Sequence, residues 1–146
     1  LHLSLRRQRQ MCIRDSLCDQ CCINLFRYTS YAYGKVREYA ASDEEFTRRA
    51  GFALLATLAV GDKRASDDDF RAFLPLIERG AEDSRVRIGK AVNWALRQIG
   101  KRSRGLYPDA LALARRLAAK EGAAARRIGR DAVRELTLER IIARIK

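Results

Sequence analysis

The stretch R-V-R-I-G-K-A-V-N-W-A-L-R-Q-I-G-K, at residues 85–101 of this 146-residue chain, gives the clearest indication of its fold class. At 100° per residue on a helical wheel, its apolar side chains gather on one side, as in a helix with a core-facing stripe. These side chains are Ile88, Val92, Ala95, Leu96 and Ile99. The stretch therefore predicts an amphipathic helix, capped at Ser84 and ending near Gly100.

The opposite side of this helix carries four cations and the one tryptophan of the chain, within a sector of roughly 80°. They are Arg87, Lys90, Trp94, Arg97 and Lys101. One interpretation is a solvated charged face with a half-buried tryptophan. The other, which we favour, is a face that neutralises phosphates with its cations and offers Trp94 as an aromatic platform.

Helices extend from this stretch in both directions, and they repeat. The dipeptides R-A at 49–50, K-A at 90–91 and D-A at 131–132 stand 41 residues apart, each within the second helix of a predicted pair. A period of about 40–47 residues with two helices per unit is typical of HEAT or armadillo repeats. We therefore predict an all-α fold, a HEAT-like helical-repeat solenoid of antiparallel helix pairs with a curved binding surface.

Caps and breakers set the remaining helix boundaries, and no alternating apolar and polar segment predicts a strand. Ser42 with Glu45 forms a predicted capping box, and Thr137 is a predicted cap. These helices are expected at about 18–25, 30–41, 43–60, 66–79, 108–120, 123–135 and 137–145.

Charge is the strongest compositional signal. The net charge is +12 and the pI is near 10.2, which indicates a polyanionic partner, either nucleic acid or an anionic membrane surface. Residues 85–146 hold 17 Lys or Arg against 5 Asp or Glu, so the charge is concentrated on one part of the chain. No apolar run reaches the ~18 residues of a membrane span. A peripheral membrane protein is disfavoured because no helix pairs a basic face with an exposed apolar face.

A second basic cluster lies in the next repeat. Arg126, Arg127, Arg130 and Arg134 fall within roughly 100° of one helix, and Arg115 and Arg116 lie on its partner. Charge runs are usually solvated faces, but these recur in neighbouring repeats. They predict the edge of a groove that grips DNA phosphates without reading base sequence.

Four cysteines crowd the N-terminal end, at Cys12, Cys18, Cys21 and Cys22. This crowding does not suit a disulfide framework and favours a reducing compartment, so we expect a cytoplasmic protein. Tetrahedral zinc needs four ligands, and the one histidine, His2, lies far outside this C-x-x-C segment. We expect the cysteines to be packing residues and the protein to use no metal and no cofactor.

Residues 1–16 do not read as part of the domain. The letters M-C-I-R-D-S at 11–16 resemble one reading frame of a transposon end used in sequencing libraries. A signal peptide does not fit, because no apolar core of about 7–15 residues follows the positive charges. We therefore expect residues 1–16 to be an unstructured artefact and residues 17–146 to be a truncated domain.

Asp19 stands on a helix face with Ile23 and Phe26, off the cysteine stripe. A carboxylate beside apolar groups is costly unless it has a partner or a task. The alternative is a helix N-terminal carboxylate that interacts with the helix dipole. Both interpretations stay open at this point.

Three segments together carry a family resemblance. They are C-D-Q-C-C-I-N-L-F at 18–26, E-F-T-R-R-A-G-F-A-L-L-A at 45–56 and G-K-A-V-N-W-A-L-R-Q-I-G-K-R at 89–102. In order and spacing, from about Leu17 onward, they resemble the DNA alkylation repair family, which consists of N-alkylpurine DNA glycosylases built from HEAT-like repeats.

The resemblance implies roles for matching residues. Asp19 corresponds to the catalytic carboxylate, Arg49 to an arginine that contacts the DNA backbone beside the lesion, and Trp94 to one of two lesion-facing tryptophans. The other tryptophan is expected four residues before Asp19, where this chain has Asp15.

The implied activity is hydrolysis of the N-glycosidic bond of cationic N3- or N7-alkylated purines in duplex DNA, by a monomer. Such a base is already a good leaving group, so one carboxylate that stabilises the oxocarbenium-like transition state is sufficient. The alternative is a non-enzymatic HEAT-like DNA-binding or scaffold module that uses the same basic groove without chemistry at Asp19.

Overall fold

The computed structural model describes residues 16–25, 28–29 and 31–145. The expectation that residues 1–16 are unstructured lies outside this range, except at Ser16, which is helical, as are residues 17–24. Asp15 lies outside it as well. None of the helices within the described ranges is both long and apolar enough to cross a membrane.

The described residues form helices and no strand, as the periodicity predicts. After the helix at 16–24, the elements are α2 (Ala32–Ala40), α3 (Glu45–Gly61), α4 (Asp67–Arg71), α5 (Leu74–Gly80), α6 (Val86–Arg102), α7 (Tyr107–Ala119), α8 (Ala123–Leu136) and α9 (Glu139–Ile142).

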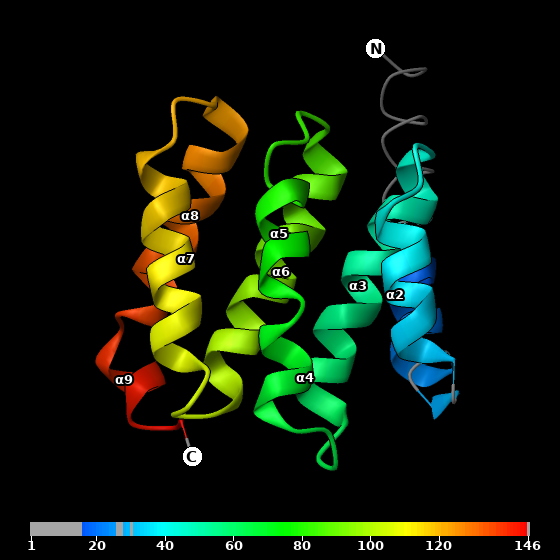
Figure 1. The fold of residues 1–146 in the computed structure, drawn as a ribbon, viewed down its shortest axis with the longest axis horizontal. Helices are drawn as coiled ribbons and strands as arrows, with labels where there is room; N and C mark the ends of the chain where they lie inside the picture. The colour runs from blue at the N-terminus through cyan, green and yellow to red at the C-terminus, as the bar shows by residue number, and fades with distance from the viewer. Residues whose placement is uncertain (1–15, 26–27, 30, 146) are drawn as a thin grey trace, which may run out of the picture.

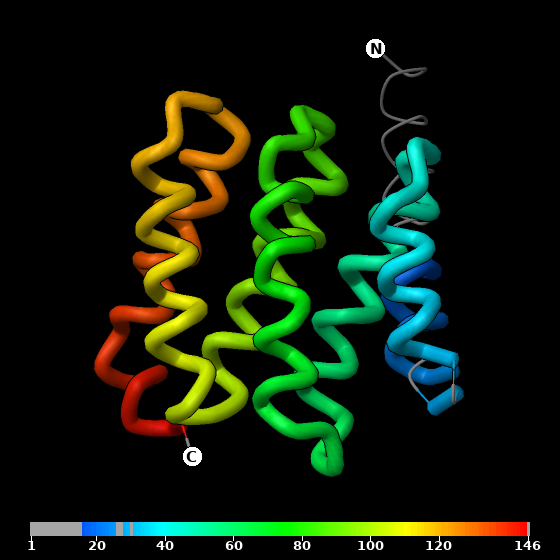
Figure 2. Tube along the Cα trace, viewed as in Figure 1, coloured from blue at the N-terminus to red at the C-terminus, as the bar shows by residue number. Residues whose placement is uncertain are grey.

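The helices form two layers (Figure 1). The front layer contains α2, α4, α5 and α7, and the rear layer contains the helix at 16–24, α3, α6 and α8. In the colour sequence of Figure 2, the chain runs upward through the front layer and downward through the rear layer, so that each rear-layer helix is antiparallel to the front-layer helix before it. Within the rear layer α3 packs on α6 and α6 packs on α8. Residues on these helices therefore share one side of the molecule.

The core lies between the layers and takes large side chains from both. The predicted stripe of α6 is fully buried, with Ile88, Val92, Ala95, Leu96 and Ile99 all at 0% exposure. From the other helices the largest buried side chains are Phe52, Leu54, Leu55, Leu58, Phe70, Phe73, Ile77 and Leu113. Burial of each such side chain contributes roughly 1.5–3 kcal/mol. This apolar layer is the main support for the two rows of helices.

The contact between α7 and α8 depends on Gly129. A Cβ atom there would lie 2.2 Å from the backbone nitrogen of Ala118 and 2.6 Å from the carbonyl oxygen of Ala114. The absence of a side chain therefore lets the two helix backbones meet at close range.

Ion pairs link neighbouring helices on the outer side of the front layer. Arg71 of α4 donates to Asp109 of α7 at 2.7 Å, and Arg116 of α7 lies 3.4 Å from Glu78 of α5. Because these pairs are largely exposed, each adds only about 0–1 kcal/mol to stability.

Three predicted boundaries are wrong, each for a local reason. The helix expected at 66–79 is divided into α4 and α5 by a turn at 72–73, next to Pro75, which has no N–H to donate to a continuing helix. The capping box predicted at Ser42 and Glu45 does not form, because α3 starts after Glu44 and this N-cap residue makes no side-chain hydrogen bond. A capping box forms instead at Ser66 and Asp69, at the start of α4.

Thr137 caps no following helix. Its hydroxyl donates to the carbonyl of Val133 at 2.8 Å and so completes the end of α8. The segment expected as a helix over 137–145 contains only the four-residue α9.

Candidate active site and nucleic-acid interface

Asp19 and Arg49 meet face to face across two helices of the rear layer. Arg49 Nη1 donates to Asp19 Oδ1 at 2.7 Å, and Nη2 donates to Oδ2 at 3.0 Å. This two-bond geometry is the strongest arrangement that a guanidinium and a carboxylate can adopt. The structure thus brings Asp19 and Arg49 into direct contact, whereas the resemblance implied that Arg49 contacts the DNA backbone.

Helix packing holds this pair in place. Cys22, one turn after Cys18 on the same helix, is 1% exposed, and its Sγ lies 3.7 Å from the carbonyl oxygen of Ala50 in α3. The hydroxyl of Thr57 lies 3.5 Å from the carbonyl of Cys22. Through Cys22, the helix at 16–24 thus contacts α3 next to the Asp19–Arg49 pair.

Arg49 is the single charged residue that is buried within the described part of the chain, with 6% exposure. A buried guanidinium is costly unless an acidic partner faces it, and Asp19 is that partner. The Asp19 side chain keeps 28% of its surface exposed. Of the two interpretations of Asp19, the partnered carboxylate is therefore the one that the structure supports.

Trp94 lies on α6, the next helix of the rear layer. It is half-buried and packs against the core cluster, which differs from the expectation of an indole standing apart from the core stripe. Trp94 directly precedes Ala95, which is fully buried, and packing between helices brings the indole against the core.

Three of the four cations predicted on α6 are held by acids of neighbouring rear-layer helices. Arg87 Nη1 lies 3.2 Å from Glu45 of α3. Arg97 and Lys101 both pair with Glu135 of α8, with the Lys101 contact at 2.7 Å. Lys90 is exposed. The stripe is therefore a ladder of ion pairs between helices rather than a row of unpaired cations.

Glu135 is the centre of this ladder. Burial raises the pKa of its carboxyl, but the hydrogen bonds from Lys101 and Arg97 outweigh burial and hold the pKa below 4.5, its ordinary value. Two cations thus converge on one carboxylate, which is the arrangement that they would offer to a phosphate group.

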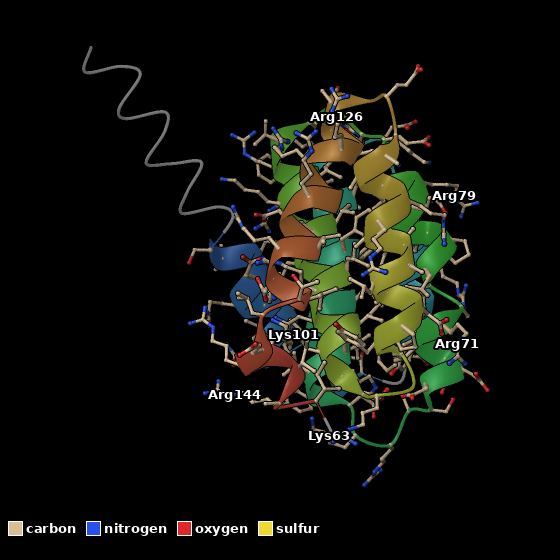
Figure 3. All side chains as sticks on the ribbon, turned by 90° about the vertical axis from the view of Figure 1, so that its left-hand side faces the viewer. Lys63, Arg71, Arg79, Lys101, Arg126 and Arg144 are labelled. Atoms are coloured by element: carbon tan, nitrogen blue, oxygen red, sulfur yellow. The ribbon has the colours of Figure 1, made fainter. Side chains whose placement is uncertain are left out.

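The basic cluster of α8 is more open. Arg127 and Arg130 are exposed, Arg126 is partly so, and together with Asp131 and Arg134 they line a shallow hollow on the helix. Arg134 pairs with Asp131 one turn away. Figure 3 shows Arg126 at the upper end of the molecule, near the start of α8, and Arg71 and Arg79 at the right-hand edge, on the front layer. The first half of α8 thus presents a cationic surface, formed by Arg126, Arg127 and Arg130.

Sequence reasoning missed the acids that hold the basic stripe. Asp131 accepts from Asn93 at 2.6 Å, and Glu135 and Glu45 hold the cations described above. A signal was present, since Glu45 precedes Arg87 by 42 residues and Glu135 follows Arg97 by 38. An acidic residue about one repeat length from a basic residue, on the equivalent helix of the next repeat, therefore predicts an ion pair between the two helices.

The cysteines follow the packing interpretation in part. Cys22 is buried, Cys18 and Cys21 are half-buried, and all three are free thiols. Cys12 lies outside the described residues. Across residues 16–25, 28–29 and 31–145, no three His, Cys, Asp or Glu side chains are grouped as metal ligands would be.

The fold and site define an all-helical protein with a carboxylate–guanidinium pair beside basic helix faces. A family model described as "DNA alkylation repair enzyme" matches residues 4–136, and the chain belongs to this family. The matched range starts before Leu17, where we expected the resemblance to start. No curated protein and no solved structure matches the chain. Family membership implies an enzyme that acts on DNA.

Proposed function

We propose that this protein is a DNA glycosylase that hydrolyses the N-glycosidic bond of cationic N3- or N7-alkylated purines in duplex DNA, acting as a monomer. The observation that carries the proposal is the two-bond Asp19–Arg49 pair. It fixes one carboxylate, still 28% exposed, on the rear layer that also carries the basic faces of α6 and α8.

The chemistry requires little more than this carboxylate. An alkylated purine is positively charged and leaves without a general acid, so the difficult part is the positive charge that develops on the sugar. A carboxylate has about four acceptor positions, of which Arg49 uses two. The others are available to stabilise the oxocarbenium-like sugar and to orient the attacking water.

Arg49 and Trp94 complete the proposed site. Because Arg49 holds Asp19 from its buried side, it orients the carboxylate before the substrate arrives. The part of the half-buried Trp94 side chain that stays exposed would offer its aromatic surface to the cationic base.

DNA binding uses the basic faces of the rear layer in two ways in this proposal. Lys90, Arg126, Arg127 and Arg130 reach phosphates directly. Arg87, Arg97 and Lys101 reach them only when a phosphate replaces the carboxylate of Glu45 or Glu135, because those acids hold them in the free protein.

The architecture that we propose for this function is a HEAT-like solenoid with a period near 41 residues. Support comes from ion pairs that recur at intervals of 42 and 38 residues between consecutive rear-layer helices. In a solenoid, equivalent helices are neighbours and line one face. Asp19, Arg49 and Trp94 would then share that face.

The test is release of free base from duplex DNA that carries N7-methylguanine. We expect release by the wild-type chain and a loss of at least 100-fold in Asp19→Asn, because the amide carries no charge to stabilise the sugar. The matched control is Asp109→Asn, since Asp109 also pairs with an arginine, Arg71 at 2.7 Å, but in the front layer. Full release by Asp19→Asn would disprove the assignment.

The second candidate is a DNA-binding module without catalysis. It is favoured by the burial of Arg49, because a salt bridge to a buried guanidinium also serves as a tie between two helices. Under this candidate the wild-type chain binds DNA and releases no base, so the same assay separates the two.

A further inference from the structure

A hollow of about 640 Å³ lies where α8 ends and the chain turns into α9. Two of its arginines, Arg140 and Arg144, have no role in the proposed function. The lining of this α8–α9 hollow consists of four arginines, two acids and two apolar residues, which are Arg97, Arg134, Arg140, Arg144, Asp131, Glu135, Leu138 and Ile141. Because arginines outnumber acids, the lining carries a net positive charge.

The segment that carries Arg140 and Arg144 is folded against the rest of the molecule. It ends on Ile145, which is only 5% exposed, and Arg104 Nε donates to the carbonyl oxygen of Ile145 at 3.4 Å. The backbone N–H of Arg144 donates to the carbonyl of Ile141 at 3.0 Å and closes the turn. Both arginines therefore extend from a backbone that is already in place before a ligand arrives.

The two acids of the lining already have cationic partners. Glu135 pairs with Arg97 and Lys101. Asp131 pairs with Arg134. The other two arginines of the lining are exposed, and within the described ranges neither of them forms an ion pair. The positive charge that remains for a ligand is therefore that of these two side chains.

The α8–α9 hollow continues the cationic surface of α8. The smaller hollow that Arg126, Arg127 and Arg130 line, of about 410 Å³, shares Asp131 and Arg134 with it. A guanidinium binds phosphate oxygens through two parallel N–H donors. Because a DNA strand carries one phosphate per nucleotide, a single strand can place phosphates in two adjoining hollows.

We propose that the α8–α9 hollow is a phosphate-binding site for the DNA that flanks the damaged base, in which Arg140 and Arg144 hold one backbone phosphate. The position of this phosphate relative to the damaged base rests on the proposed function, which places the base at Asp19.

The packing of the rear layer gives the length of the flank. The helix at 16–24 contacts α3, α3 packs on α6, and α6 packs on α8. Packed helices lie about 8–10 Å apart, so these three steps cover roughly 24–30 Å, or about 7–9 base pairs at 3.4 Å each. Since α8 lies to one side of Asp19 in this row, the hollow should hold the flank on one side of the damaged base only.

The first experiment measures binding to an undamaged duplex of about 24 base pairs, by fluorescence anisotropy at several salt concentrations. The double variant Arg140→Gln, Arg144→Gln should lower the slope of log affinity against log salt by about 0.9 and weaken binding roughly eightfold at 0.1 M salt, because one phosphate contact is lost. The matched control is Arg79→Gln, Arg115→Gln, which removes two exposed arginines from α5 and α7 of the front layer. It changes the net charge equally and should keep the wild-type slope.

An unchanged slope in the first double variant, or equal losses in both, would overturn the proposal. Circular dichroism should show wild-type unfolding temperatures for both variants, since all four side chains are exposed. An acidic protein segment is the other partner that such arginines could bind, and labelled poly-glutamate is the probe for it. Loss of poly-glutamate binding with unchanged duplex affinity in Arg140→Gln, Arg144→Gln would also overturn the proposal.

The second experiment tests the one-sided flank. N7-methylguanine is placed about 4 base pairs from one end of the duplex or from the other, and affinities of the wild type and Arg140→Gln, Arg144→Gln are compared. With one placement the wild type should bind roughly eightfold more tightly, and with the other the two should bind alike. The same difference for both placements would overturn the one-sided arrangement. If the wild type releases no base from either duplex, the proposed function fails, and the slopes on undamaged DNA still decide whether the hollow holds a phosphate.

Discussion

Asp19 and Arg49 share two parallel hydrogen bonds, of 2.7 and 3.0 Å, yet they differ in exposure. The Arg49 side chain is 8% exposed and the Asp19 side chain is 28% exposed. Loss of Asp19 therefore removes two charged hydrogen bonds from a guanidinium in the interior, whereas loss of Arg49 leaves a carboxylate that water can reach. The two partners of one salt bridge should respond differently to removal.

We predict that Asp19→Ala destabilises the fold by about 2 kcal/mol, because the buried guanidinium loses two charged hydrogen bonds. Arg49→Met should cost about 1 kcal/mol less, since its apolar chain fills the site and the carboxylate is hydrated. Urea unfolding followed by circular dichroism measures both free energies. Equal costs, or a larger cost for Arg49→Met, would contradict the burial argument.

Glu135→Gln should strengthen DNA binding. The substitution removes the carboxylate that holds Arg97 and Lys101, and both cations then become available to phosphates. Each phosphate contact adds roughly 0.9 to the slope of log affinity against log salt, so the slope should steepen by about 1–2. Fluorescence anisotropy with a labelled duplex at several salt concentrations gives this slope.

The matched control is Glu78→Gln. Glu78 is likewise shared by an arginine and a lysine, Arg116 and Lys120, each at 3.4 Å, but it lies in the front layer. Its loss changes the net charge equally and should leave the slope as in the wild type. If both variants steepen the slope alike, net charge rather than the α6–α8 ladder explains the effect.

The link between α6 and α8 should weaken in acid. Because the pKa of Glu135 is below 4.5 in the folded state, its ion pairs contribute stability above pH 4.5 that is lost as the pH falls through the lower folded-state value. The difference in unfolding free energy between wild type and Glu135→Gln should be constant near pH 6 and shrink below pH 4.5. A difference that grows in acid would mean that the pKa is shifted upward.

Two glycine substitutions should act in opposite directions. Gly129→Ala should destabilise by about 3 kcal/mol, because its Cβ would lie 2.2 Å from backbone of α7 and neither helix can yield locally. Gly34→Ala, within α2, meets nothing within 4 Å and should stabilise by about 0.5–1 kcal/mol through helix propensity. Thermal unfolding of the two variants checks both signs.

Much of the fold follows from periodicity. The core stripe of α6 could be predicted because five apolar residues recur at helical spacing and all five are buried. The break between α4 and α5 was missed although Pro75 signals it, because the apolar pattern continues through Phe70 and Phe73, both buried. Both phenylalanines are buried in the same core even though the helix is interrupted between them, because packing against the other helices determines their burial.

The candidate site was predictable to a lesser degree. Composition predicted a basic surface, and the family resemblance identified Asp19 and Arg49 as site residues. Neither predicted that the two side chains form hydrogen bonds with each other. The pairing of Arg97 and Lys101 with Glu135 was missed because wheel analysis treats one helix at a time, whereas these pairs join different helices. The position of Trp94 was missed for the same reason, since its neighbours on the core side come from the packing of the rear layer.

Ionic links that join neighbouring helices on both layers have a mechanical consequence. Arg71–Asp109 spans the front layer, and Arg87–Glu45 spans the rear layer. When neighbouring helices tilt relative to one another, the distances within the ion pairs of one layer increase and those of the other layer decrease. The ion pairs therefore oppose such movement. Salt shortens the range of such forces to about 8 Å at physiological ionic strength and less above it. We therefore expect salt to modulate how easily neighbouring helices move relative to one another, with slightly easier movement in high salt than in low salt.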